Sequence, residues 1–148
     1  MREGEKKSPI LMVEGDSMDE LRAIRAYRET QHTNRLLVAR STEHALTLLR
    51  AFSNGLRFGL VLLDMHAPRL GAADLLRRIR KDPLIHDTSV VILAPPNQPE
   101  DSIEAVAENA DGWAKKPETT AEFCSLLNGL LERYLGVRSK ATCKEAGR

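Results

Sequence analysis

The sequence predicts an α/β fold, a doubly wound parallel sheet of five strands and five helices in the strand order 2-1-3-4-5. Short apolar runs, bounded by glycine, proline or charged residues, recur along the chain. They alternate with longer segments in which apolar residues recur at helical spacing. The runs show no polar alternation, which indicates strands buried on both faces. Such strands occur in parallel sheets that helices cover on both sides.

The third strand is the central element of this prediction. Leu60 to Leu63 form an uninterrupted apolar run, and Asp64 follows directly. Pro68 and Gly71 then turn the chain towards the next helix. The five expected strands are 10–13, 36–39, 59–64, 90–93 and 113–115.

Capping residues and breakers predict the helix ends. Ser17, with Glu20 three residues on, predicts a capping box, and Asn54-Gly55 predicts a left-handed C-cap. Asp82-Pro83 ends the third helix. The expected helices run from 17 to about 31, from 41 or 42 to about 52, from 74 to 81, from about 99 to 110, and from about 118 to 134.

The length of 148 residues suits one domain, expected at 9–135 between an N-terminal tail (1–8) and a basic C-terminal tail (136–148). The net charge of +1 argues against a chain that binds nucleic acid directly through its overall charge. No stretch approaches the length of a membrane span, and the apolar run 10–13 is too short for a signal peptide.

Two cysteines, Cys124 and Cys143, show no metal-ligand spacing. Cys124 falls in a helical pattern and is expected in the core, whereas Cys143 lies in the tail. A disulfide is not expected, and a cytoplasmic location follows from that.

Charged residues follow three of the expected strands. The strand order puts the ends of strands one and three side by side, so Glu14, Gly15, Asp16 and Asp64 should face one crevice. Lys116, after strand five, would close it. Carboxylates that face a lysine provide an oxygen nucleophile, ligands for a divalent cation and a positive group for phosphoryl oxygens. The cluster therefore predicts a phosphoryl-accepting site.

On these residues the sequence resembles the receiver domain of two-component response regulators, over about residues 9–135. The matching pieces are Val13-Glu14, Leu62-Leu63-Asp64-Met65 with Pro68, and Lys116-Pro117. Segments 37–40 and 80–83 are similar to the single-domain receivers that partner bacterial phytochrome kinases. The resemblance implies a flavodoxin-like (βα)5 fold and Mg²⁺ as cofactor.

The resemblance also implies a role for each matching residue. Asp64 is the phosphoacceptor and Lys116 contacts the phosphoryl group. The implied metal ligands are Glu14, Asp64 and the backbone carbonyl of His66, with Asp16 as a further candidate. Ala94 and Trp113 fall on the two switch positions, and Pro117 would follow a cis peptide bond.

Two departures from the family pattern affect these expectations. The family has a second acid where this chain has Gly15, with Asp16 one residue later, so weak Mg²⁺ binding is expected. The family has Ser or Thr where this chain has Ala94, followed by Pro95-Pro96. A methyl group cannot donate a hydrogen bond to a phosphoryl oxygen, so a reduced switching response is expected.

The expected function is that of a stand-alone response regulator, not an enzyme, that takes phosphate from a sensor histidine kinase or a phosphotransfer protein. No helix-turn-helix is seen after Leu135, so output is expected through protein contacts, with a homodimer as a candidate. Its interface would be the strand-four/helix-five side or an extended last helix. The alternative is a pseudo-receiver that is not productively phosphorylated. An enzyme on the same fold has no support from a glycine-rich phosphate loop or a Ser-His-Asp set.

Overall fold

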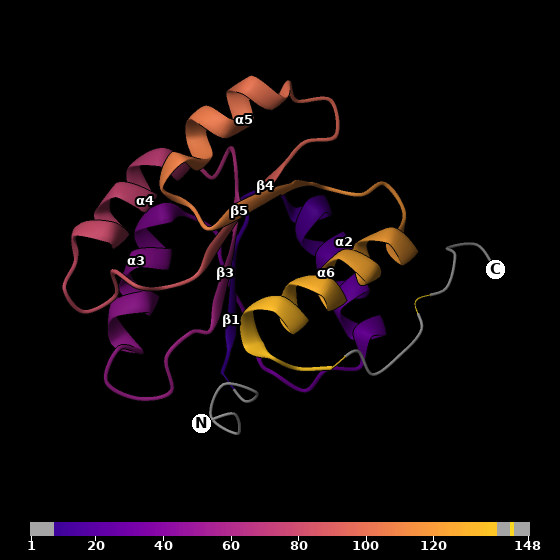
Figure 1. The fold of residues 1–148 in the computed structure, drawn as a ribbon, viewed down its shortest axis with the longest axis horizontal. Coiled ribbons are helices and arrows are strands. Elements are labelled where there is room, and N and C mark those ends of the chain that lie inside the picture. Colours follow the sequence, from indigo (N-terminus) through magenta and orange to yellow (C-terminus); the bar gives the residue numbers. More distant parts are fainter. Residues whose placement is uncertain (1–7, 139–142, 144–148) are drawn as a thin grey trace.

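The computed structural model describes residues 8–138 and residue 143, and these form one five-stranded sheet with helices on both faces (Figure 1). In chain order the elements are β1 (Ile10–Val13), α2 (Ser17–Thr30), β2 (Leu36–Ala39), α3 (Thr42–Ala51), β3 (Leu60–Asp64), α4 (Ala72–Lys81), β4 (Val90–Ala94), α5 (Glu100–Val106), the 3-10 helix η1 (Ala107–Asn109), β5 (Gly112–Lys115) and α6 (Thr120–Leu135). All neighbouring strands are parallel, in the order β2-β1-β3-β4-β5. The predicted flavodoxin-like fold and strand order are confirmed.

Alternate residues of the central strands enter two separate cores. In β1, Leu11 and Val13 pack with α3, α4 and α5, whereas Ile10 and Met12 pack with α2 and α6. Figure 1 shows these helices on opposite sides of the sheet. β3 and β4 are buried along their whole lengths. Helices cover both faces of these strands, so every side chain along them is buried. This explains the continuous apolar runs from which the strands were predicted.

The start of α2 differs from the prediction. Asp16, not Ser17, is the N-cap, and its Oδ1 accepts hydrogen bonds from two backbone N–H groups of the first turn at 2.8 and 2.9 Å. Glu20 does not close a capping box. Instead the Arg40 guanidinium donates to both of its carboxylate oxygens, at 3.0 and 2.8 Å. Asp caps as well as Ser does, and Arg40 gives Glu20 a charged partner that the local sequence does not reveal.

The end of α3 also differs from the prediction. The C-cap is Phe52 in the right-handed helical region, and neither Asn54 nor Gly55 has a positive φ. The Phe52 ring packs on Phe58, with 4.6 Å between the ring centroids. The helix ends before the Asn-Gly pair, which lies in a following turn where the N–H of Gly55 donates to the carbonyl of Phe52 at 3.2 Å, so the predicted left-handed cap is wrong.

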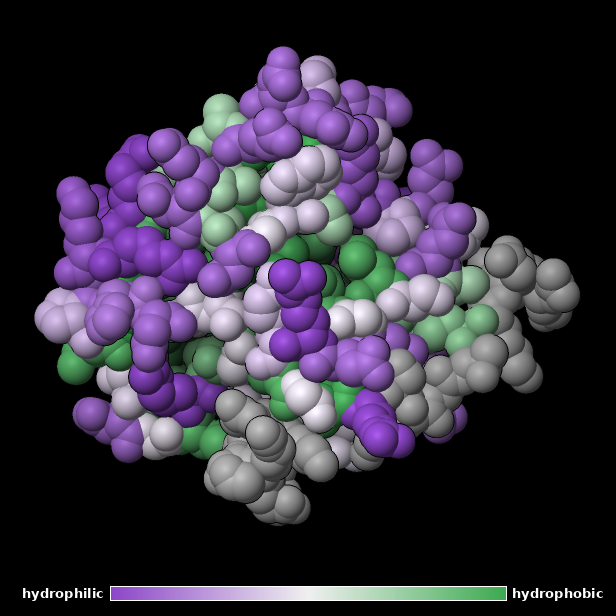
Figure 2. Space-filling model, in the orientation of Figure 1, coloured by the Kyte–Doolittle hydropathy of each residue, from purple (hydrophilic) through white to green (hydrophobic). Residues whose placement is uncertain are grey.

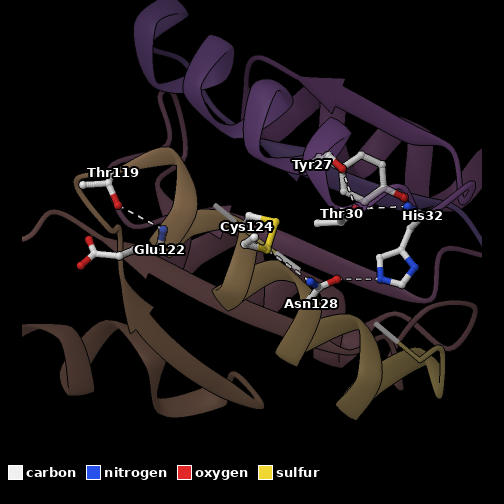
Figure 3. Close-up of a disulfide and its surroundings, with 8 residues drawn as sticks. Tyr27, Thr30, His32, Thr119, Glu122, Cys124 and Asn128 are labelled. Carbon is white, nitrogen blue, oxygen red and sulfur yellow. Dashed lines mark hydrogen bonds between the residues drawn. A yellow bond between two sulfur atoms is a disulfide. The ribbon is translucent and has the colours of Figure 1, made fainter. Parts of the chain in front are cut away.

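The two cysteines form a disulfide, contrary to the prediction. Cys124, fully buried in α6, bonds to Cys143, with 5.8 Å between their Cα atoms (Figure 3). Asn128 Nδ2 donates to Cys143 Sγ at 3.4 Å, and Asn128 Oδ1 lies 2.9 Å from His32 Nε2. The 19-residue separation gave no sign that residue 143 returns to α6. Because disulfides persist mainly in oxidising compartments, the cysteines no longer support a cytoplasmic location.

Hydrophilic residues cover most of the α3 and α4 side of the face in Figure 2, and hydrophobic residues reach the surface between α5 and α6. Among the described residues, no helix combines the length and the apolar character that crossing a membrane requires. The predicted tails fall mostly on residues 1–7, 139–142 and 144–148, which lie outside the described part. Val137, inside the predicted C-terminal tail, is buried against the α2 and α6 core.

Candidate functional site

The carboxyl ends of three strands bring the charged residues of the site together. β1 and β3 run parallel and in register up to the residues before Glu14 and Asp64, so these two carboxylates are neighbours. Lys116 follows β5, and its backbone N–H donates to the carbonyl of Ala94 at 2.7 Å. Glu14 and Asp64 are only 4% and 8% exposed. Buried carboxylates need charged or hydrogen-bonding partners, so the position of Lys116 is decisive.

The ammonium group of Lys116 supplies that partner. Its Nζ lies 2.7 Å from Asp64 Oδ1, 2.9 Å from Glu14 Oε1 and 2.8 Å from Asp19 Oδ2. An ammonium has three N–H donors, so these three carboxylates account for all of them. The site is a compact cluster in which one cation joins the ends of β1 and β3 to the first turn of α2.

Asp19 was not identified from the sequence. It lies in the first turn of α2, and that turn begins directly beyond the end of β1. An acidic residue three positions after the helix N-cap, on the helix that follows the first strand, was the available signal. It would equally fit a solvated acid that stabilises the positive end of the helix dipole.

An open cleft lies over this cluster. The residues expected to face one crevice all line it, and Asp19 joins them. The lining residues are Glu14, Gly15, Asp16, Asp19, Asp64, His66, Pro68, Pro95 and Lys116.

Burial and charge set the protonation of the cluster. Burial raises the pKa of the Glu14 carboxyl, which the hydrogen bond from Lys116 opposes and the negative charge of Asp64 reinforces. Burial alone would lower the pKa of the Lys116 ammonium, but its hydrogen bonds to Asp19, Asp64 and Glu14 raise it. Lys116 is therefore charged at neutral pH, and three carboxylates face one ammonium. This surplus of acidic groups favours a second cation in the cleft.

Gly15 has no room for a side chain. A Cβ atom at this position would lie 2.7 Å from Pro68 Cδ and 2.8 Å from Pro68 Cγ. The backbone N–H of Thr42 donates to the carbonyl of Pro68 at 3.3 Å, and its hydroxyl lies 3.2 Å from that oxygen. Thr42 Oγ1 also accepts from the N–H of Leu70 at 2.9 Å. The loop after β3 thus fixes the proline ring against the position where the family has its second acid.

Asp16 lies next in the chain and lines the cleft. Its Oδ1 is engaged in the cap of α2, and the backbone N–H of Asp19, foremost among these contacts, lowers the pKa of the Asp16 carboxyl. Asp16 therefore carries a negative charge at the cleft, but the cap holds one of its two oxygens.

The remaining predicted positions are spread around the site. Ala94 is fully buried at the end of β4, and Trp113 is half-buried against the core formed with α3, α4 and α5. The His66 side chain is exposed, with Nε2 3.3 Å from Gln98 Oε1. The peptide bond before Pro117 is not cis, contrary to the prediction. The trans form of an X–Pro bond is favoured by about 0.5–1 kcal/mol, so the Lys-Pro pair does not by itself fix the isomer.

The donor set suits a hard divalent cation. Among the described residues, no three His, Cys, Asp or Glu side chains converge as a ready ligand set. Mg²⁺ commonly takes one or two carboxylates and keeps several waters. Glu14 and Asp64 provide two carboxylates beside an open cleft, which fits such a water-rich ion.

Comparisons with known proteins agree with this fold. The probable methanogenesis regulatory protein FilR2 of Methanothrix harundinacea is 25% identical over 136 residues, which are 90% of this chain and 88% of that protein. The crystal structure of the phosphorylated cyanobacterial phytochrome response regulator RcpA has a TM-score of 0.73 and 22% identity, covering 95% of this chain and 99% of RcpA. The Mn²⁺-bound form of response regulator Rcp1 has a TM-score of 0.70 and 22% identity, covering 90% and 99%.

The likeness to RcpA and Rcp1 supports the fold. The family itself is shown by a comparison of the sequence with a family model. The model described as the response regulator receiver domain matches residues 10–128, most of the chain. The chain belongs to the family of response regulator receiver domains.

Proposed function

We propose that this chain accepts a phosphoryl group on Asp64 from a phosphohistidine and signals through protein–protein contacts. The donor would be a sensor histidine kinase or a phosphotransfer protein. The observation that carries this proposal is the position of Asp64, which ends the central strand in an open cleft with the Lys116 ammonium 2.7 Å from its Oδ1. Membership of a signalling family supports it.

The transfer would exchange one bond for another. An Asp64 oxygen forms the new O–P bond while the P–N bond to the histidine breaks, and the electron pair of that bond stays on the nitrogen. The Lys116 ammonium would then neutralise phosphoryl oxygens as their charge develops. Glu14, Asp64 and the backbone carbonyl of His66 would hold Mg²⁺, which supplies further positive charge to the phosphoryl oxygens when bound.

Mg²⁺ is expected to bind weakly at this site. Gly15 contributes no ligand, and the ring of Pro68 fills the space where a side chain would start. Asp16 is the candidate to compensate through the oxygen that does not cap α2. Mg²⁺ titration of the native chain and of Asp16→Ala would decide this. Tight binding that is lost in Asp16→Ala would show that Asp16 substitutes for the missing acid. Tight binding that Asp16→Ala leaves unaffected would refute the expectation of a weak site.

The second candidate function is a pseudo-receiver, an interaction module that is not productively phosphorylated. The Gly15–Pro68 contact favours it, because this contact excludes a second acid. The buried methyl group of Ala94 also favours it, because this position then lacks a hydroxyl donor. The ion pairs of Lys116 with Glu14 and Asp64 favour the phosphorylated function.

Intact-mass measurement after incubation with acetyl phosphate and Mg²⁺ tests the proposal. The native chain should gain one phosphoryl group and Asp64→Asn should gain none. Asp87→Asn is the matched control, since Asp87 is an exposed acid paired with Arg57 outside the cleft, and it should be labelled like the native chain. Label that persists in Asp64→Asn would refute the assignment, and no label on the native chain would support the pseudo-receiver.

Self-association and location are further parts of the proposal. Leu127 and Leu131 of α6 are buried in the core, whereas Leu126, Leu130 and Tyr134 are only partly buried. These three residues are the part of the apolar face of α6 that a second copy could contact. Light scattering at high concentration, with and without acetyl phosphate, should detect a dimer, and a monomer throughout would exclude it. The proposed location is the cytoplasm, which rests on the proposed signalling function and not on the cysteines, and no direct contact to nucleic acid is proposed.

A further inference from the structure

Lys116 is held by more carboxylates than phosphoryl transfer requires. Glu14 and Asp64 are the expected partners, and their side chains are 5% and 10% exposed. Asp19 is a third partner at 2.8 Å, and its side chain is 37% exposed. Because each N–H donor of the ammonium already has a carboxylate, Lys116 cannot gain a new acceptor without releasing one of the three.

A cation in the cleft would weaken two of these three contacts. Lys116 donates to one oxygen each of Glu14 and Asp64, so an ion bound to these carboxylates takes up their negative charge and repels the ammonium. The Lys116 side chain is only 11% exposed, so water can reach it poorly. A charged group that loses its partners while buried is strongly destabilised. The ammonium therefore needs a counter-ion that does not belong to the metal site.

Asp19 is placed to be that counter-ion. It belongs to α2, whose first turn is fixed because its own N–H donates to Asp16 Oδ1 at 2.9 Å. A small cavity of about 20 Å³ lies beside it, enough for about one water molecule. The charged residues that line this cavity are Glu14, Asp19, Arg22 and Lys116, and Asp64 is not among them. The ammonium thus has space beside Asp19 in a cavity that Asp64 does not line.

We propose that Asp19 is a positioning residue for Lys116: it retains the ammonium when Glu14 and Asp64 turn to a divalent cation. This role rests on the proposed function of the same cleft. The site then has two states. In one, Lys116 bridges three carboxylates; in the other, it is paired with Asp19 beside the bound cation, ready to meet a phosphoryl oxygen on Asp64.

A double-mutant cycle on the full chain tests this role with Mg²⁺ as the probe. Asp19→Asn should weaken Mg²⁺ binding, measured by calorimetry, by about tenfold, the lower end for a hydrogen bond between charged groups. In a Lys116→Met background the same substitution should change the affinity less than about twofold, because no ammonium is left to retain. Glu20→Gln is the matched control: it removes the neighbouring acid of α2, whose partner is Arg40, and should also have less than about a twofold effect.

A spectroscopic readout covers the case in which Lys116→Met does not fold. The Nζ–Hζ signal of Lys116 should be protected from exchange in the native chain and in Glu20→Gln, and lost in Asp19→Asn. Asp19→Glu, which keeps a carboxylate on the same turn, should restore part of the protection and of the Mg²⁺ affinity.

The outcomes separate this role from the proposed function. Equal weakening by Asp19→Asn in both backgrounds, or by Asp19→Asn and Glu20→Gln, would show that Asp19 acts only as a nearby charge and would overturn the inference. An unchanged Lys116 signal in Asp19→Asn would also overturn it. Failure of the native chain to accept phosphate would refute the proposed function, while Mg²⁺ affinity and the Lys116 signal would still decide the role of Asp19.

Discussion

The contact between Gly15 and Pro68 gives the sharpest prediction for the metal site. Gly15→Asp would supply the acid that the family has at this position, yet its Cβ would lie 2.7 and 2.8 Å from two ring atoms of Pro68. Carbon atoms pack best at about 3.5–4.0 Å, so the ring would have to move by most of an ångström. Thr42 holds the proline carbonyl, and Arg69, the next residue, already has a φ of 80°. Forcing a side chain into such a packed place costs about 1–3 kcal/mol.

The assay separates this steric cost from any gain in metal binding. Gly15→Ala adds only the Cβ, and it should lower the free energy of unfolding in urea by about 1–3 kcal/mol. Pro68→Ala removes both ring atoms that the Cβ would meet, so in that background Gly15→Ala should cost little. Gly15→Asp should likewise bind Mg²⁺ better only when combined with Pro68→Ala. The reasoning is refuted if Gly15→Ala leaves stability unchanged, or costs the same in both backgrounds.

Three other features give predictions of their own. Ala94→Thr should increase the response of Trp113 emission to acetyl phosphate, because it adds a donor worth about 1.5–3 kcal/mol to a charged acceptor; a native response just as large would contradict this. Without reductant, Cys143→Ser should lower the free energy of unfolding by about 3 kcal/mol, because the disulfide closes a loop of about 20 residues and so lowers the entropy of the unfolded chain. Equal stability of the two proteins would show that the disulfide does not form. Burial raises the pKa of Tyr27 from 10.0 to about 12, so the native chain should lose stability as pH rises through this window, where only the unfolded state ionises. Urea unfolding of Tyr27→Phe should not show that loss. If the free energy of unfolding falls equally with pH in both proteins, ionisation of Tyr27 is not its cause.

The strand order followed from the sequence because apolar runs and helical spacing are local signals, and few topologies accommodate five such units. The adjacency of Glu14 and Asp64 followed from that order, since both stand directly after strands that pair in parallel. The end of α3 did not follow, because Phe52 takes the C-cap in the right-handed region and Asn54-Gly55 lies in a turn beyond the helix, closed by the hydrogen bond from Gly55 N–H to the carbonyl of Phe52.

The sequence by itself determined the sheet, its two covered faces and the edge at which the acids and Lys116 meet. Only the tertiary structure decided the third carboxylate on Lys116, the proline ring against Gly15 and the disulfide between Cys124 and Cys143. Each of these depends on where one side chain lies relative to another that is distant in the chain. Periodicity and capping report how a segment folds locally. They carry no information on which side chains two separate segments place within a few ångströms of each other.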